Sequence, residues 1–147
     1  MININTVTAA VKTLLDGNGT VAAWLNKPVV NGDFINELPG QTPWVGVYRG
    51  GVKHNPRTLG MQPNNWESTI TLKIVLQDTS YVSAADCESL LELHTKDIIT
   101  ALVTDTTIGN TVDMINNFDI SYGYIDTDRE SLYYQTAIIT FEAEVRA

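Results

Sequence analysis

Two side chains that could act as a nucleophile and a base lie on one segment of the chain, Cys87 and His94. A thiol becomes a catalytic nucleophile when a base lies within hydrogen-bond distance of it. On a helix, a spacing of seven residues places both side chains on one face but two turns apart. This spacing disfavours Cys-His catalysis, so we interpret Cys87 as a small buried apolar residue and His94 as a partly buried structural histidine.

The sequence also lacks a motif for binding a metal ion or a phosphate group. The chain has one cysteine, and its second histidine is His54, so a multi-cysteine or histidine-rich metal site is not expected. The turn Asp126–Glu130 alternates acidic residues like a calcium loop, but it lacks the glycine and the final glutamate that such a loop needs. No glycine-rich phosphate loop follows a predicted strand. We therefore expect no catalytic residue, no metal and no cofactor, and a protein that is not an enzyme.

Composition narrows the class of protein further. The chain has 147 residues, 44% of them apolar, which fits a single α+β domain over residues 1–147. Nine Lys and Arg stand against seventeen Asp and Glu, a formal net charge of −8. A general nucleic-acid binder is not expected, because such proteins neutralise phosphates with Lys and Arg. No apolar run approaches the roughly 18 residues of a membrane span, so we expect no membrane contact.

The first half of the chain predicts helices followed by strands. Apolar residues recur at helical spacing up to Leu15, and Thr6 can cap this helix. A short helical turn follows, for which Thr20 is the expected cap. After a stretch rich in Asn, Gly and Pro, residues 44–49 form a short β-rich segment. Residues 67–78 alternate apolar and polar, which predicts a strand whose buried face is formed by Ile70, Leu72, Ile74 and Leu76.

One long helix and a hairpin make up the rest. Ser83 and Asp86 occupy the positions of a capping box, and an apolar stripe continues to Val103. Alternation returns over residues 117–124 and 132–146, and these two runs predict a long antiparallel hairpin. The fold class that follows is α+β: a mainly antiparallel sheet with an N-terminal helix and one long central helix packed on one face.

A long loop between the two central strands is the main candidate for a binding element. We expect it to run from Gly50 to Trp66, whereas hairpin loops usually have about two to five residues. Because ordering such a loop costs conformational entropy, we interpret it as an element that docks on a neighbouring subunit or partner, the alternative being a solvated hairpin tip. The residues expected to make this contact are basic or apolar: Arg49, Lys53, His54, Arg57, Leu59 and Met61.

The order of these elements resembles that of the tail terminator (tail completion) proteins of long-tailed bacteriophages. The resemblance covers nearly the whole chain and concerns architecture. It rests on five segments: the helix Thr6 to Leu15, the loop and strand from Leu38-Pro39-Gly40 to Tyr48, the strand Ile70 to Leu76, the capped helix Ser83 to Val103, and the closing hairpin ending Ala137 to Val145. None of them is a diagnostic motif, so no functional residue of the family is carried over.

This resemblance implies a structural virion protein that forms a hexameric ring on the tail tube, stops tube growth and joins the tail to the neck. The implied partners are further copies of the chain, the tail-tube protein, the neck or connector protein and, in contractile tails, the sheath protein. The implied location is the virion tail or neck, after assembly in the host cytoplasm. DNA would pass through the ring without specific binding, repelled by an acidic wall. The acidic residues that could line this channel are Asp126, Asp128, Glu130, Glu142 and Glu144.

Two alternatives stay open at this point. One belongs to the same assembly, a head-completion or neck adaptor or a tail-tube subunit. The other belongs to a different class, a small-molecule binding α+β domain or hydrolase, which the missing acid/base pair disfavours.

Overall fold

In the part of the chain that the structure describes, the fold consists of three helices and six strands. It is taken from a computed structural model, which describes residues 3–25, 28–31, 43–56, 66–127 and 132–146. The elements, in chain order, are α1 (Ile4–Gly17), α2 (Gly19–Trp24), β1 (Val30–Asn31), β2 (Trp44–Pro56), β3 (Trp66–Ser80), α3 (Ala84–Thr104), β4 (Met114–Tyr122), β5 (Asp126–Thr127) and β6 (Tyr133–Arg146).

The strands form one twisted sheet in the order β1-β2-β3-β6-β4, with β5 pairing to β6. All pairs are antiparallel except β1 with β2, which is parallel. The long ladder between β3 and β6 places Ile74 opposite Ile139 and runs from Glu67 to Ser80. The pairing of β4 with β6 confirms the predicted closing hairpin.

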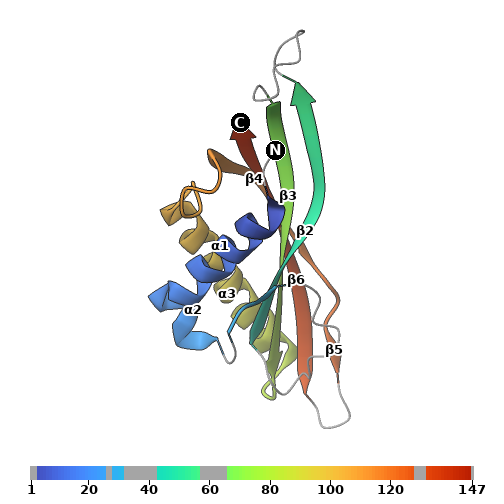
Figure 1. The fold of residues 1–147 in the computed structure, drawn as a ribbon. Helices are drawn as coiled ribbons and strands as arrows, with labels where there is room; N and C mark the ends of the chain where they lie inside the picture. The colour runs from blue at the N-terminus through green and yellow to red at the C-terminus, as the bar shows by residue number, and fades with distance from the viewer. Residues whose placement is uncertain (1–2, 26–27, 32–42, 57–65, 128–131, 147) are drawn as a thin grey trace.

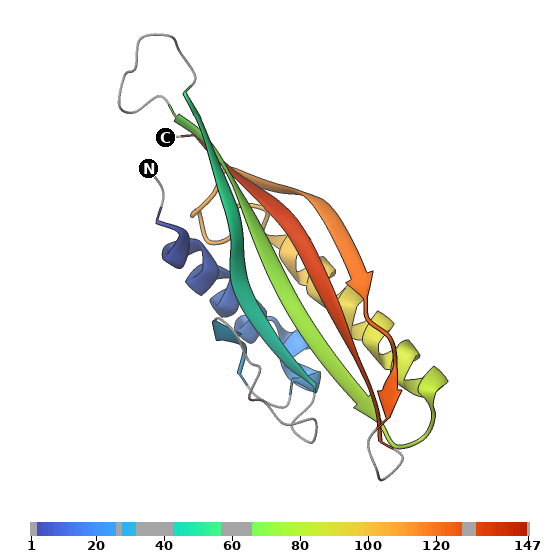
Figure 2. The ribbon, with the colours of Figure 1, turned by 90° about the vertical axis from the view of Figure 1, so that its right-hand side faces the viewer.

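The helices cover a single face of this sheet, and none of the described helices lies on the opposite face (Figure 1). Turning the molecule by 90° brings the uncovered face to the front, with the helices behind it (Figure 2). The predicted apolar face of β3 is completely buried under the helices, from Ile70 to Leu76. It packs with Phe141 of β6, which is also 0% exposed. The α+β class and the one-sided helical layer are therefore confirmed.

Asparagine and serine side chains set where the helices begin. Asn3 caps α1 by accepting from the backbone N–H of Asn5, so the expected cap at Thr6 is wrong. Asn18 caps α2 by accepting from Thr20 and Val21, which corrects the expected cap at Thr20. Asn competes well for this position because its short side chain reaches the free N–H groups of the first turn.

The cap of α3 is the one that the sequence predicts, although only one of its two bonds forms. Ser83 Oγ accepts from the N–H of Asp86 at 3.0 Å. The carboxylate of Asp86 turns away from the cap and accepts from Ser80 Oγ at 2.6 Å. Asp86 therefore ties the start of α3 to the end of β3.

The expected loop from Gly50 to Trp66 has to be corrected at both ends. Strand β2 continues through Gly50 and Gly51 to Pro56, and β3 begins at Trp66, which pairs with Pro56. The register shifts between Arg49 and Val52, so the two glycines form a β-bulge instead of ending the strand. Residues 57–65 lie outside the described residues.

Candidate functional site

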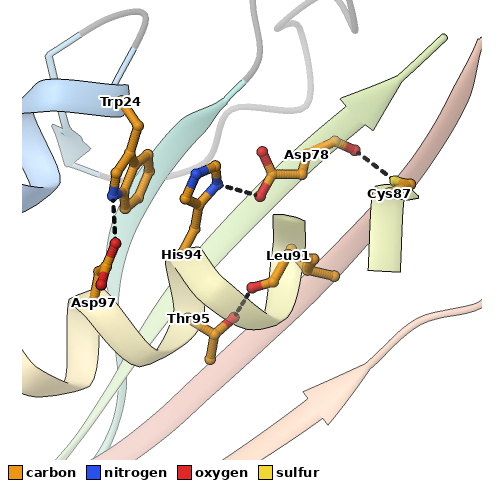
Figure 3. Close-up of polar contacts among 7 residues, drawn as sticks. All are labelled: Trp24, Asp78, Cys87, Leu91, His94, Thr95 and Asp97. Atoms are coloured by element: carbon orange, nitrogen blue, oxygen red, sulfur yellow. Dashed lines mark hydrogen bonds and ion pairs between the residues drawn. The ribbon is translucent and has the colours of Figure 1, made fainter. Parts of the chain in front are cut away.

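A buried polar cluster joins β3, α3 and α2 (Figure 3). Nδ1 of His94 lies 2.7 Å from Oδ2 of Asp78, and the two side chains are 8% and 2% exposed. Asp78 continues the even-numbered face of β3 that is buried beneath the helices, and His94 lies on the apolar stripe of α3. Asp78 thus comes from the buried face of β3 and His94 from the buried face of α3. The two side chains satisfy each other's need for a hydrogen-bond partner.

Trp24 closes this cluster from the side of α2. Its ring stacks on His94, with the ring centroids 4.1 Å apart and an angle of 17° between the planes. Its indole Nε1 donates to Oδ2 of Asp97 at 3.0 Å. Trp24 therefore points toward α3, and its two partners there fix α2 against the long helix.

Cys87 does not pair with His94. Its Sγ contacts the backbone carbonyl oxygen of Asp78 at 3.5 Å, and the residue is 0% exposed. Burial raises the pKa of the Cys87 thiol to about 11, and the negative charges of Asp78, Asp86 and Glu88 add to the rise. A thiol with so high a pKa is a poor nucleophile at neutral pH. The cluster therefore works as a polar clamp between secondary-structure elements.

Three of the predicted docking residues lie in strand β2, and they do not share one face. The guanidinium of Arg49 donates to Oδ1 of Asn5 at 3.3 Å, beside the start of α1. His54 lies opposite Ser68, and its Nδ1 is 2.6 Å from the Ser68 hydroxyl. Lys53 is exposed and points to the other side of the strand, opposite Thr69. The other three, Arg57, Leu59 and Met61, lie outside the described residues.

These residues mark a part of the sheet that extends beyond the helices. Strands β2 and β3 continue past the N-terminal end of α1 (Figures 1 and 2). We call the paired segments Lys53–Pro56 and Trp66–Thr69 the arm. Lys53, His54 and Asn55 are all exposed there. The arm therefore offers two accessible faces close to the basic residues.

The predicted channel residues are divided between two ends of β6. Glu142 accepts from Asn117 at 2.9 Å and Glu144 from Asn116 at 3.4 Å, so both lie beside β4. Asp126 lies opposite Tyr134, eight residues before Glu142 on the same strand, or about 26 Å away at the usual rise per residue. Asp128 and Glu130 lie outside the described residues. The described acidic residues thus do not form one cluster.

A shallow groove that the sequence does not reveal lies between α3 and the end of β4. It has a volume of about 330 Å³ and is lined by Glu88, Glu92, Tyr122 and Gln135. Glu88 and Glu92 are exposed and stand one turn apart on α3. The groove depends on the distance between α3 and the sheet. The pattern of polar and apolar residues along a single helix or strand therefore does not predict it.

Neither a metal site nor a membrane helix is found in the part of the chain that the structure describes. No three or more His, Cys, Asp or Glu side chains gather there so that they could hold a metal ion. None of the described helices is long and apolar enough to span a bilayer. The expectation that the protein is not an enzyme and carries no cofactor stays a prediction.

Similarity to known proteins is found at the level of structure. No family model matches the sequence, and no curated protein matches it. Among solved structures, the chain is similar to a chain of the virion of a native gene transfer agent (GTA) particle, with 10% identity, 93% of each chain covered and a TM-score of 0.41. We carry no residue role from that structure to this chain.

Proposed function

We propose that this protein is a structural virion protein of a phage-type particle, a tail terminator that forms a hexameric ring on the end of the tail tube. In this role it stops tube growth and joins the tail to the neck or connector. Its partners are further copies of itself, the tail-tube protein, the neck protein and, in a contractile tail, the sheath protein. It acts by shape and charge and has no catalytic step.

The observation that carries this proposal is the arm. The arm leaves the helical layer while β3 stays paired with the end of β6 from Glu67 to Thr69, so β2 forms its outer edge and exposes side chains on two faces. Lys53, His54 and Asn55 are exposed on it. A neighbouring subunit would cover these faces, and the basic and apolar residues Arg49, Lys53, His54, Arg57, Leu59 and Met61 are the proposed contacts.

The uncovered sheet face supports the same role. It carries Thr71, Lys73 and Thr140, which are half-buried by their neighbours on the sheet and not by a second layer. Strand β4 forms one edge of the sheet, so its outer backbone groups are free to pair with another chain. A subunit with one free face and one free edge suits a closed ring of identical copies.

The acidic residues would face the passage for DNA in this arrangement. Glu142 and Glu144 lie on the uncovered face, and Asp126 lies on the same face further along β6. Carboxylates repel phosphates, so a wall that carries them lets DNA pass without sticking. Asp128 and Glu130 are proposed to extend this wall.

The test is to make particles without the protein and image their tails. A tail terminator predicts tubes of excessive and variable length that fail to join heads, and the wild-type chain supplied in trans should restore both. Tubes of normal length that join heads would overturn the proposal.

A second variant tests the loop at the end of the arm. Residues 57–65 are replaced by Asn-Gly, which can close the Pro56–Trp66 pair as a tight hairpin turn. Circular dichroism should show the native fold, whereas assembly should be lost. If the shortened chain still forms rings, the loop is not part of the interface.

A further inference from the structure

The groove between α3 and β4 has a lining that favours a positively charged occupant. Glu88 and Glu92 are like charges one turn apart on α3, an arrangement that is unfavourable without a cation nearby. Lys96 lies 3.2 Å from Glu92, but the two side chains are 71% and 61% exposed, so this pair is weak. Lys96 therefore offsets at most the charge of Glu92, and the groove keeps the negative charge of Glu88.

Gln135 provides an independent indication of a hydrogen-bond donor in the groove. The residue is 7% exposed, and its Nε2 donates to the carbonyl oxygen of Gly123 at 2.7 Å. This bond fixes the orientation of the amide, since a flipped amide would place two oxygens together. Its Oε1 is buried and has no partner among the described residues. A buried acceptor without a partner is costly, so a bound molecule that donates to it would be favoured.

The described lining thus contains the carboxylates of Glu88 and Glu92, the side chain of Gln135 with its unpartnered Oε1, and Tyr122. Carboxylates and carbonyl oxygens accept hydrogen bonds, and an aromatic face attracts cations. Lys and Arg side chains combine positive charge with several donors. The groove therefore has the chemistry of a pocket for a basic side chain.

The charge distribution of the chain identifies the source of that side chain. Strand β2 contains Arg49 and Lys53 and no acidic residue, whereas α3 contains four acidic residues and one lysine. Lys53 is exposed on the arm and has no acidic residue opposite it on β3, where its partner is Thr69. The β2 side of the arm therefore carries the positive charge of Lys53, which is complementary to the groove, whereas the acidic Glu67 lies on the β3 side.

A subunit cannot place its own arm in its own groove. Lys53 lies opposite Thr69 of β3, and Gln135 lies opposite Asp78 of the same strand. These two positions on β3 are nine residues apart, which corresponds to about 30 Å. Contact between the arm and the groove thus requires two copies.

We propose that the groove formed by Glu88, Glu92, Tyr122 and Gln135 binds Lys53 on the arm of a second copy of this chain. This inference rests on the proposed function, because it gives the ring a defined contact between subunits. The contact is heterologous, joining different surfaces of the two copies, and such a contact closes into a ring when the rotation per subunit permits. Tyr122 and the neighbouring Tyr124, which are 47% and 97% exposed, become buried around the lysine.

Chemical cross-linking of the assembled protein tests this contact directly. A carbodiimide joins a lysine amine to a carboxylate in contact with it, and mixing isotopically light and heavy chains shows whether the link lies between copies. The expected product joins Lys53 of one copy to Glu88 or Glu92 of another. Assembled chains in which Lys53 is joined only to other carboxylates would overturn the proposal.

Charge reversal gives a second, independent measurement. Lys53→Glu alone and Glu88→Lys with Glu92→Lys should each raise the concentration at which half of the chains are assembled by about tenfold or more, because close interfacial charge pairs couple strongly. Combining the three substitutions should restore assembly at least in part. Thr106→Lys, at an exposed position just after the end of α3, adds the same side chain outside the proposed contacts and should leave assembly unchanged. Equal assembly of all variants, or no recovery in the combination, would overturn the contact.

The two proposals fail in different ways. If the wild-type chain assembles and limits tail length while the charge variants assemble normally, the groove is not the docking site and the ring proposal stands. If tails made without the protein have normal length and join heads, the proposed function itself is wrong.

Discussion

The carboxylate of Asp78 lies 2.7 Å from the imidazole of His94, and the pair is buried at the point where β3 passes beneath α3. Trp24 stacks on the other side of the imidazole and reaches Asp97, one turn further along α3. The ring of His94 thus joins β3 and α3 to α2, which lies far away in the sequence (Figure 3). This contact fixes how the helical layer sits on the sheet and, with it, the position of the groove.

Breaking this pair should destabilise the fold strongly. His94→Leu leaves the carboxylate of Asp78 buried without a partner, and removal of one member of a buried pair costs about 3 kcal/mol or more. Replacing both residues by leucine should cost clearly less than the sum of the two single changes, because no polar group is left unpaired. Urea unfolding of the four proteins measures this coupling. Additive single changes would show that the contact contributes nothing specific.

The two roles of Trp24 can be separated by substitution. Trp24→Phe keeps an aromatic ring against His94 but loses the N–H that donates to Asp97, so we expect a loss of about 1 kcal/mol. Trp24→Ala also removes the stacked ring and should cost about 3 kcal/mol. Thermal or urea unfolding would reveal the difference. Equal losses for the two variants would mean that stacking on His94 is unimportant.

The sequence predicts this clamp only in part. Period-two alternation on β3 and the apolar stripe on α3 place Asp78 and His94 on buried faces, but their pairing depends on how the helix crosses the strand. Asp97 lies outside the stripe, so its bond to Trp24 follows from the position of α2 and not from a pattern. The periodicity of apolar residues predicts the helices and strands themselves. The contacts between these elements depend on tertiary packing, which periodicity does not predict.

The arm and the groove show the same limit. Gly50-Gly51 is typical of a turn, and only pairing with β3 shows that these residues form a bulge within a longer strand. Gln135 lies on the buried face of β6, but whether its oxygen finds a partner depends on the distance to α3. The basic residues near Lys53 are visible in the sequence, whereas the acidic groove is not.

The bulge at Gly50 should tolerate almost no side chain. A Cβ at this position would lie 3.1 Å from the backbone oxygen and 3.1 Å from Cγ2 of Thr71. Gly50→Ala therefore forces the backbone of β2 or β3 to move, which we expect to cost about 1–2 kcal/mol. The bulge also sets the course of the arm, so assembly should weaken more than stability alone explains.

Gly51 provides the matched control for this change. A Cβ there meets nothing within 4 Å, so Gly51→Ala should alter the unfolding free energy by no more than about 0.5 kcal/mol. Chemical denaturation of the two variants, alongside light scattering of the assembled protein, measures both effects. If Gly51→Ala is as harmful as Gly50→Ala, contact with Thr71 does not explain the glycine.

Cys87 should make the protein less stable as the pH rises above the ordinary range of a thiol. Burial raises its pKa from 9.0 to about 11, so between these values the unfolded chain loses the proton while the folded chain keeps it. Stability from this group is complete below pH 9 and is lost as the pH approaches 11, by at most about 2–3 kcal/mol. Cys87→Ala should lower stability at neutral pH but reduce its decline over this interval. Urea unfolding from pH 7.5 to 10.5 measures the difference between the two proteins, and parallel curves would show that the thiol does not contribute.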